Sequence, residues 1–257
     1  MPSQKLSKAP LVEAILEVRW RLVERPPGVT IDPKYKILVG RLYDRLETAY
    51  PFHEPLPTAS MPDEMLGYVV QHRFRIAENK WPLVQIGPGV VTLNDTENYT
   101  WDDFENRSHQ LLDHLFSVYP DAQHSLVIAN LQLRYIDAIP FEFDRNDIFA
   151  FMADKLKTQI ALSPKVFQGA PIQPLPAGFS FLVAFPTVNP IGIIRLRFAR
   201  GTQNKRDTLM WETIVQSDGA DIPQMPVGFQ GWLSGAHTLT HNLFFKLIEG
   251  SLEESFR

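Results

Sequence analysis

The chain has 257 residues, of which 44% are hydrophobic and 21% are charged, a composition typical of globular proteins. Its 25 Lys and Arg against 29 Asp and Glu give a net charge of −4, which argues against a nucleic-acid binder that relies on overall positive charge. The sequence has no cysteine, so disulfides, thiolate metal sites, iron–sulfur clusters and cysteine nucleophiles are excluded. Residues 1–8 are polar and no apolar run approaches 20 residues. We therefore expect a cytoplasmic protein without a membrane segment.

Residues 1–122 show apolar periodicities of two and of about 3.6, which indicate strands and helices respectively. Asp32-Pro33 resembles a helix start, and Thr100 with Asp103 predicts a capping box at a second helix. A proline-rich loop is expected at 51–62, and Gly87-Pro88-Gly89 predicts a turn. The expected order is a strand at 12–22, a helix to about residue 50, strands at 67–77 and 82–93, and a helix from residue 101.

Residues 123–257 repeat this order of patterns, with another proline-rich loop at 169–178. The expected elements are a strand at 126–139, a helix at 144–160, strands at 179–185, 191–199 and 208–216, and a closing helix at 228–248.

The two regions also align with each other. Residues 14–20 match residues 129–135, 115 positions later, and both are expected strands. In the closing helices, positions 128 apart match: Phe104, His109, Leu111, Leu115 and Phe116 with Trp232, His237, Leu239, Leu243 and Phe244. The difference of about 13 residues fits an extra strand at 208–216. Coincidence is the alternative, since alternating strands resemble one another.

These observations predict an α+β fold of two similar halves, residues 1–122 and 123–257, in one compact unit. Each half is expected to be an antiparallel sheet packed by two helices, in a saddle-like or helix-grip-like arrangement. Such a likeness of fold does not imply DNA binding.

Several short motifs resemble a sporadically distributed bacterial family of unknown function, whose members open with a Leu-x-Lys-Ala-Pro-Leu-Val-Glu-Ala-like motif. The motifs are residues 6–15, 84–87, 99–101 and 133–137, together with Ala236-His237. The resemblance implies a bacterial, cytoplasmic, accessory protein and supplies no reaction.

No recognised catalytic or phosphate-binding motif is present. His237 and His241 lie four positions apart on an expected helix, a spacing that places two imidazoles on one face for Zn²⁺. The Glu of a metalloprotease motif is absent, and no third ligand is evident nearby. We therefore expect no metal and no cofactor, and a structural role for His237.

Arginines recur at the outward positions of the expected strands, which would gather them on one sheet face. Guanidinium groups in a row suit recognition of carboxylates or phosphates. The alternative is a solvated face with cross-strand ion pairs such as Glu17 with Arg134. Arg21 and Arg75 share the pattern, but the residues predicted to bind a ligand or partner are Arg19, Arg73, Arg134, Arg195 and Arg197.

The leading hypothesis is a non-enzymatic binding or assembly module whose arginine-bearing face engages a protein partner or an anionic ligand. One alternative is an enzyme of unrecognised type acting on an anionic or nucleotide-like substrate, with His72, His237 or a carboxylate as base. Another is a nucleic-acid binder in which Trp20, Tyr135 or Trp211 reaches the surface for stacking. The oligomeric state stays open.

Overall fold

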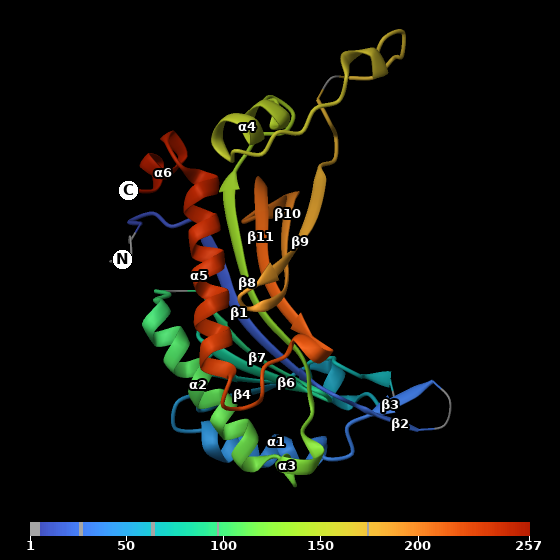
Figure 1. The fold of residues 1–257 in the computed structure, drawn as a ribbon, viewed down its shortest axis with the longest axis vertical. Helices are drawn as coiled ribbons and strands as arrows, with labels where there is room; N and C mark the ends of the chain where they lie inside the picture. The colour runs from blue at the N-terminus through green and yellow to red at the C-terminus, as the bar shows by residue number, and fades with distance from the viewer. Residues whose placement is uncertain (1–5, 26–27, 63–64, 97, 174) are drawn as a thin grey trace.

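A computed structural model describes residues 6–25, 28–62, 65–96, 98–173 and 175–257. Nine strands form one twisted antiparallel sheet (Figure 1), which confirms the α+β class. In spatial order they are β4 (Phe52–Pro55), β5 (His72–Arg75), β6 (Leu83–Gly87), β7 (Val90–Asp95), β1 (Leu11–Trp20), β8 (Ile128–Pro140), β11 (Arg206–Asp218), β10 (Ile191–Gln203) and β9 (Ser180–Val188). A separate hairpin consists of β2 (Val23–Arg25) and β3 (Val29–Ile31).

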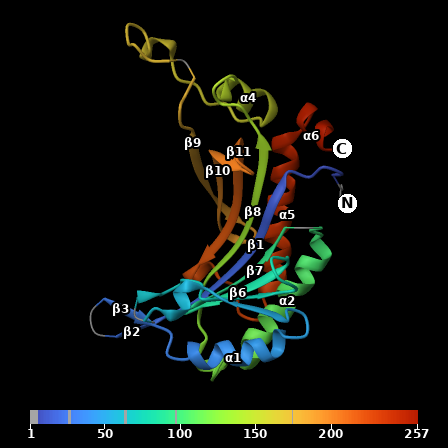
Figure 2. The same cartoon turned by 180° about the vertical axis from the view of Figure 1, so that it is seen from behind.

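The helices pack on one face of this sheet, with α2 and α5 running along it (Figures 1 and 2). Their bounds are α1 (Tyr35–Leu46), α2 (Trp101–Val118), α3 (Ala122–Ser125), α4 (Ile148–Lys155), α5 (Phe229–Ile248) and α6 (Ser251–Phe256). Short 3-10 turns lie at Pro57–Ser60, Pro164–Val166 and Gly219–Asp221. We call the sheet face that contacts the helices the helix face and the opposite one the open face. Among the described residues, no helix covers the open face.

The pleat of the strands explains why the helices bind one face only. In β1 the alternate residues Ala14, Leu16, Val18 and Trp20 are fully buried, whereas the residues between them are partly exposed. Burial of each large apolar side chain stabilises the fold by about 1.5–3 kcal/mol. One core cluster joins the helix face to α1, α2 and the start of α5, and a second joins it to α4, α6 and the end of α5.

Side-chain caps determine where α2 and α4 begin, whereas α1 begins at Tyr35 after Lys34, which makes no side-chain cap. Thr100 accepts a hydrogen bond from the amide of Asp103, which confirms the expected cap of α2. Asp147 accepts from the amides of Phe149 and Ala150, so α4 begins at residue 148 and not at 144. The buried carboxylate of Asp32 accepts from the Lys34 amide at the start of α1 and also from the Trp20 indole, at 2.8 Å.

Other sequence-based boundaries differ from the structure. Tyr68 has a positive φ of 63° and lies in a turn with Gly67, so of the expected strand at 67–77 only His72–Arg75 forms a strand of the sheet. The proline-rich segment 51–62 contributes β4. Of the other predicted segments, residues 1–5 and Pro174 lie outside the described residues.

The halves do not carry separate sheets, because β1 pairs with β8 and makes the sheet continuous. The strand at 208–216 is not an extra one, since β4 to β7 outnumber β9 to β11. β10 and β11 have 13 residues each.

The beginning and the end of the described chain lie side by side (Figure 1). The amide of Lys8 donates to the carbonyl of Phe256 at 2.9 Å, and the Ser7 hydroxyl also contacts this C-terminal segment. Within the described ranges, none of the helices combines the length and the apolar character needed to cross a bilayer.

Candidate functional site

The open face carries polar side chains across seven adjacent strands, from β5 to β10. Val18 and Trp20 of β1 and Leu133 of β8 are buried against the helices, as expected. The pleat therefore directs Arg19 and Arg134 to the open face. The register extends this face to Arg73, opposite Gln85, and to Arg195 and Arg197, opposite Ile214 and Glu212. All five predicted arginines thus share the open face.

In the part of the face formed by β5, β6, β7 and β1, the side chains make a continuous hydrogen-bond network. Arg73 Nε donates to Gln85 Oε1 at 2.8 Å, and Gln85 Nε2 donates to Asn94 Oδ1 at 3.0 Å. Thr92 donates to the same Asn94 oxygen, and Asn94 Nδ2 donates to Glu13 Oε1 at 2.8 Å. This network orders the polar groups before any partner binds, which lowers the entropic cost of recognition.

In the part of the open face formed by β8, β11 and β10, one carboxylate binds two of the arginines. Glu212 lies between two guanidinium groups, 3.0 Å from Arg134 Nη2 and 3.3 Å from Arg197 Nη1. Arg195 Nη1 donates to Gln216 Oε1 at 2.8 Å. These contacts hold Arg134 of β8 and both arginines of β10 against β11, the strand that lies between β8 and β10.

The predicted ion pair between Glu17 and Arg134 does not form. Glu17 Oε1 binds Arg19 Nε of its own strand at 2.7 Å, while Arg134 binds Glu212. Glu17 lies directly opposite Gln132, and β11 places Glu212 diagonally next to Arg134 on the other side of β8. The neighbouring strand therefore determines the partner.

Arg75 differs from the other outward arginines because its side chain is buried. Its Nε donates to Glu54 Oε2 at 2.8 Å, and its guanidinium lies 5.2 Å from the centre of the Trp81 ring. These contacts attach β4 and the turn after β5 to the sheet. Arg75 therefore has a structural role.

The aromatic residues that the nucleic-acid alternative requires at the surface are on the helix face. Trp20 and Trp211 are fully buried, and Tyr135 is half-buried and packs against the core on the helix face. They point away from the five arginines, so they are not available to stack on bases at the open face.

A partly buried chain of hydrogen bonds crosses from the sheet to α5 on the helix face. The hydroxyls of Tyr99 and Tyr135 are 2.9 Å apart, and Tyr135 Oη is 3.0 Å from His237 Nδ1. The His237 ring stacks on Trp101, with ring centres 3.7 Å apart. Burial, and to a smaller extent the nearby His241, lowers the pKa of His237 to about 4, so its imidazole is neutral at pH 7. This chain was not predicted from the sequence, although residues 99–101 and 236–237 belong to the motifs of the family resemblance.

His72 and His237 do not belong to one site. His72 Nδ1 lies 3.0 Å from His53 Nε2, and the His53 ring lies between His72, Tyr43 and Phe74. His237 belongs to the cluster with Trp101 and Tyr135. Within the described ranges, no group of three or more His, Asp and Glu side chains is arranged to hold a metal ion.

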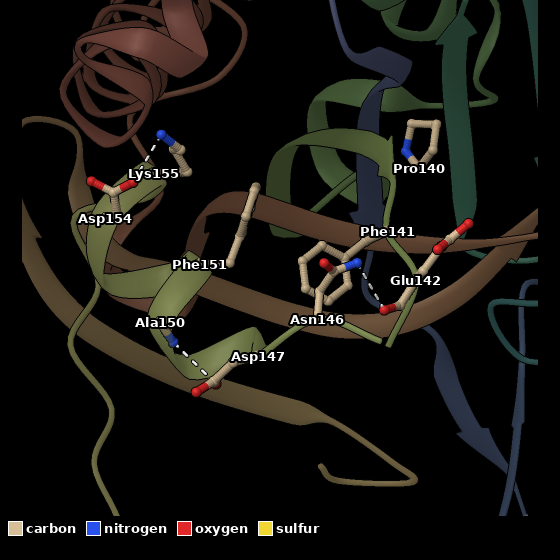
Figure 3. Close-up of a pocket in the computed structure, with 9 residues that line it drawn as sticks. All are labelled: Pro140, Phe141, Glu142, Asn146, Asp147, Ala150, Phe151, Asp154 and Lys155. Atoms are coloured by element: carbon tan, nitrogen blue, oxygen red, sulfur yellow. Dashed lines mark hydrogen bonds and ion pairs between the residues drawn. The ribbon is translucent and has the colours of Figure 1, made fainter. Parts of the chain in front are cut away.

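A cavity of about 660 Å³ lies beside α4 (Figure 3). Its polar side chains serve the local structure: Asn146 donates to the Glu142 carbonyl, Asp147 caps α4, and Lys155 binds Asp154. A second cavity of about 350 Å³ lies between α5 and the turn at Asn189. The five arginines line neither cavity.

No family model matches the sequence, and no curated protein matches it either. The likeness to the sporadically distributed bacterial family therefore depends on the short motifs alone.

Proposed function

We propose that the chain is a non-enzymatic binding or assembly module that engages a protein partner through its open face. The observation that carries this proposal is the position of every long helix on the helix face, which leaves Arg19, Arg73, Arg134, Arg195 and Arg197 together on the other face. An uncovered sheet face with ordered polar side chains is suited to a partner that exchanges hydrogen bonds with it.

The charges on the open face favour a protein partner over a polyanion. Glu13, Glu17, Glu54 and Glu212 lie among the five arginines and nearly balance them. A surface of mixed sign selects a complementary arrangement of charges and does not simply attract negative charge.

The arginines keep donors for a partner. Each guanidinium has five N–H groups, and the side chains of Arg197, Arg19, Arg73 and Arg134 are 49%, 40%, 34% and 31% exposed. Their contacts with carboxylates and amides restrict rotation, so less side-chain entropy is lost on binding. A partner carboxylate can accept two parallel N–H bonds from such a group.

We also propose that the two halves are copies of one structural unit. From the centre of the sheet outward, the order is β1, β7, β6, β5 on one side and β8, β11, β10, β9 on the other. The helices that follow these strands, α2 and α5, begin at Trp101 and Phe229. These two positions are 128 residues apart, the same separation as between the matching positions of the closing helices. Superposition of β1, β7 and β6 on β8, β11 and β10 tests this, and a best fit that does not pair residue 14 with residue 129 would overturn it.

A pull-down with the full chain tests the function. The Arg19→Ala/Arg134→Ala double variant should lose a captured protein that the wild type retains, because both donors lie on the open face of the adjacent central strands β1 and β8. Arg145→Ala is the matched control, since this exposed arginine lies in the segment before α4. All three proteins should have the same far-UV circular dichroism, because none of these substitutions removes a side chain of the core on the helix face. Undiminished capture by the folded double variant would exclude the open face.

Retention on DNA and RNA at near-physiological salt separates the protein-binding proposal from its nucleic-acid alternative. We expect no retention under these conditions. Retention that falls with salt and is lost in the double variant would favour nucleic acid instead.

A further inference from the structure

The sheet ends on one side in an unprotected strand, β9, at its outer margin (Figure 1). Residues 180–188 read Ser-Phe-Leu-Val-Ala-Phe-Pro-Thr-Val and contain no charged residue. Leu182, Phe185 and Val188 are 61%, 51% and 91% exposed. A long apolar edge strand without charges has a strong tendency to pair with another strand.

The opposite edge of the sheet is different. β4 has only four residues, of which Pro55 cannot donate to a neighbouring strand, and it carries His53 and Glu54. Short length, proline and charge are the features that protect sheet edges from pairing. β9 also contains one proline, Pro186, but it is nine residues long and uncharged, so it is the less protected of the two edges of this sheet.

The backbone direction of β9 identifies the groups at its free side. Arg200 N donates to Phe179 O at 3.0 Å, so the odd-numbered residues of this strand direct their N–H and C=O groups toward β10. The even-numbered residues direct theirs outward. Ser180, Leu182, Ala184 and Val188 thus present an outward N–H and C=O, and Pro186 presents only its carbonyl.

We propose that β9 pairs antiparallel with β9 of a second copy of this chain, about a two-fold axis at Ala184. Ala184 is the middle residue of the strand, so this register pairs its whole length and places Ser180 opposite Val188 of the copy. A two-fold interface requires a surface that is compatible with itself. β9 meets this requirement because identical uncharged strands bring no like-charge repulsion, whereas a charged edge would.

Pairing of β9 between two copies extends the proposed function, and it depends on residues other than the five arginines. Opposite residues of an antiparallel pair point to the same sheet face, so the open faces of both copies would lie on the same side. Arg195, which is opposite Ala184 in the neighbouring strand, would lie three strand spacings, about 14 Å, from its counterpart in the copy. The dimer would thus present two sets of arginines on one continuous sheet.

Sedimentation of the full chain at concentrations up to about 100 µM tests the dimer without any partner. Ala184→Pro removes only an outward N–H and should weaken self-association about tenfold or more, with unchanged circular dichroism. A wild type that is monomeric throughout this range would overturn the inference. Capture of a partner by such a monomer through Arg19 and Arg134 would leave the proposed function intact.

A cysteine placed at the axis gives a second test that does not depend on the proline variant. The chain has no cysteine of its own. Ala184→Cys should form a covalent dimer on mild oxidation, because Cα atoms of a hydrogen-bonded antiparallel pair are about 5.5 Å apart, within disulfide range. Val227→Cys, at an exposed position in the loop before α5, is the control and should stay monomeric. Equal cross-linking of both variants would contradict the register.

Discussion

The indole of Trp101 lies flat against the imidazole of His237, with ring planes 4° apart and ring centres separated by 3.7 Å. Trp101 is the first residue of α2 and His237 lies in the middle of α5. The reverse contact also exists: His109 of α2 meets Phe229, the first residue of α5, edge to face at 5.4 Å. Both pairs of equivalent positions are 128 residues apart, so the two helices make reciprocal contacts. This relationship supports the proposed two copies of one unit.

Replacement of His237 should change how stability depends on pH. The pKa of His237 is about 4 in the folded protein because the ring is buried, and about 6.5 in the unfolded chain. As pH falls from 6.5 to 4, the unfolded state gains a proton that the folded state does not, so stability falls. We expect His237→Asn to lose less stability over this range, by on the order of 2 kcal/mol, in denaturant titrations at several pH values. His124→Asn, at an exposed imidazole, is the control and should not reduce the loss.

Asp137 provides the opposite test at higher pH. Burial raises its pKa to about 8, so the folded protein keeps a proton that the unfolded chain releases near pH 4. Stability should therefore fall as pH rises from 4 to 8. Asp137→Asn should remove on the order of 2 kcal/mol of this fall, measured by thermal or chemical unfolding. Asp144→Asn is the exposed control, and an identical pH profile for both variants would contradict the assignment.

Loss of the carboxylate between two arginines should destabilise the open face. Glu212 is mostly buried between Arg134 and Arg197, so Glu212→Gln leaves two guanidinium groups without their shared anion. We expect a loss of about 1–2 kcal/mol in urea unfolding. Glu142→Gln breaks an exposed pair with Arg145 and should change stability by less than about 0.5 kcal/mol. Equal effects of the two substitutions would show that Glu212 does not organise the face.

Truncation of Phe104 should measure how tightly α2 packs on the sheet. Phe104 is fully buried next to Tyr99 and Trp101. Phe104→Ala should therefore lower the free energy of unfolding by about 3–5 kcal/mol. Ile37→Ala, at an exposed position of α1, is the control and should stay within about 0.5 kcal/mol of the wild type. A melting temperature that is unchanged by Phe104→Ala would contradict the burial.

Several features could be predicted from the sequence because they depend on neighbours along the chain. Side chains alternate between the two faces of a strand, so the burial of Val18 and Leu133 and the outward direction of Arg19 and Arg134 followed from the pattern. The cap of α2 depends on Thr100 and Asp103, three positions apart. The α+β class followed from the order of these elements.

The tertiary structure decided what depends on distant segments. Arg134 binds Glu212, which lies 78 residues later, because β11 is the neighbour of β8, and alternation within a strand does not specify which strand lies beside it. The contacts of His237 with Trp101 and Tyr135 likewise require two helices and the sheet to meet. The sequence by itself thus determined which face each side chain occupies. The order of the strands, a product of long-range packing, decided the partners.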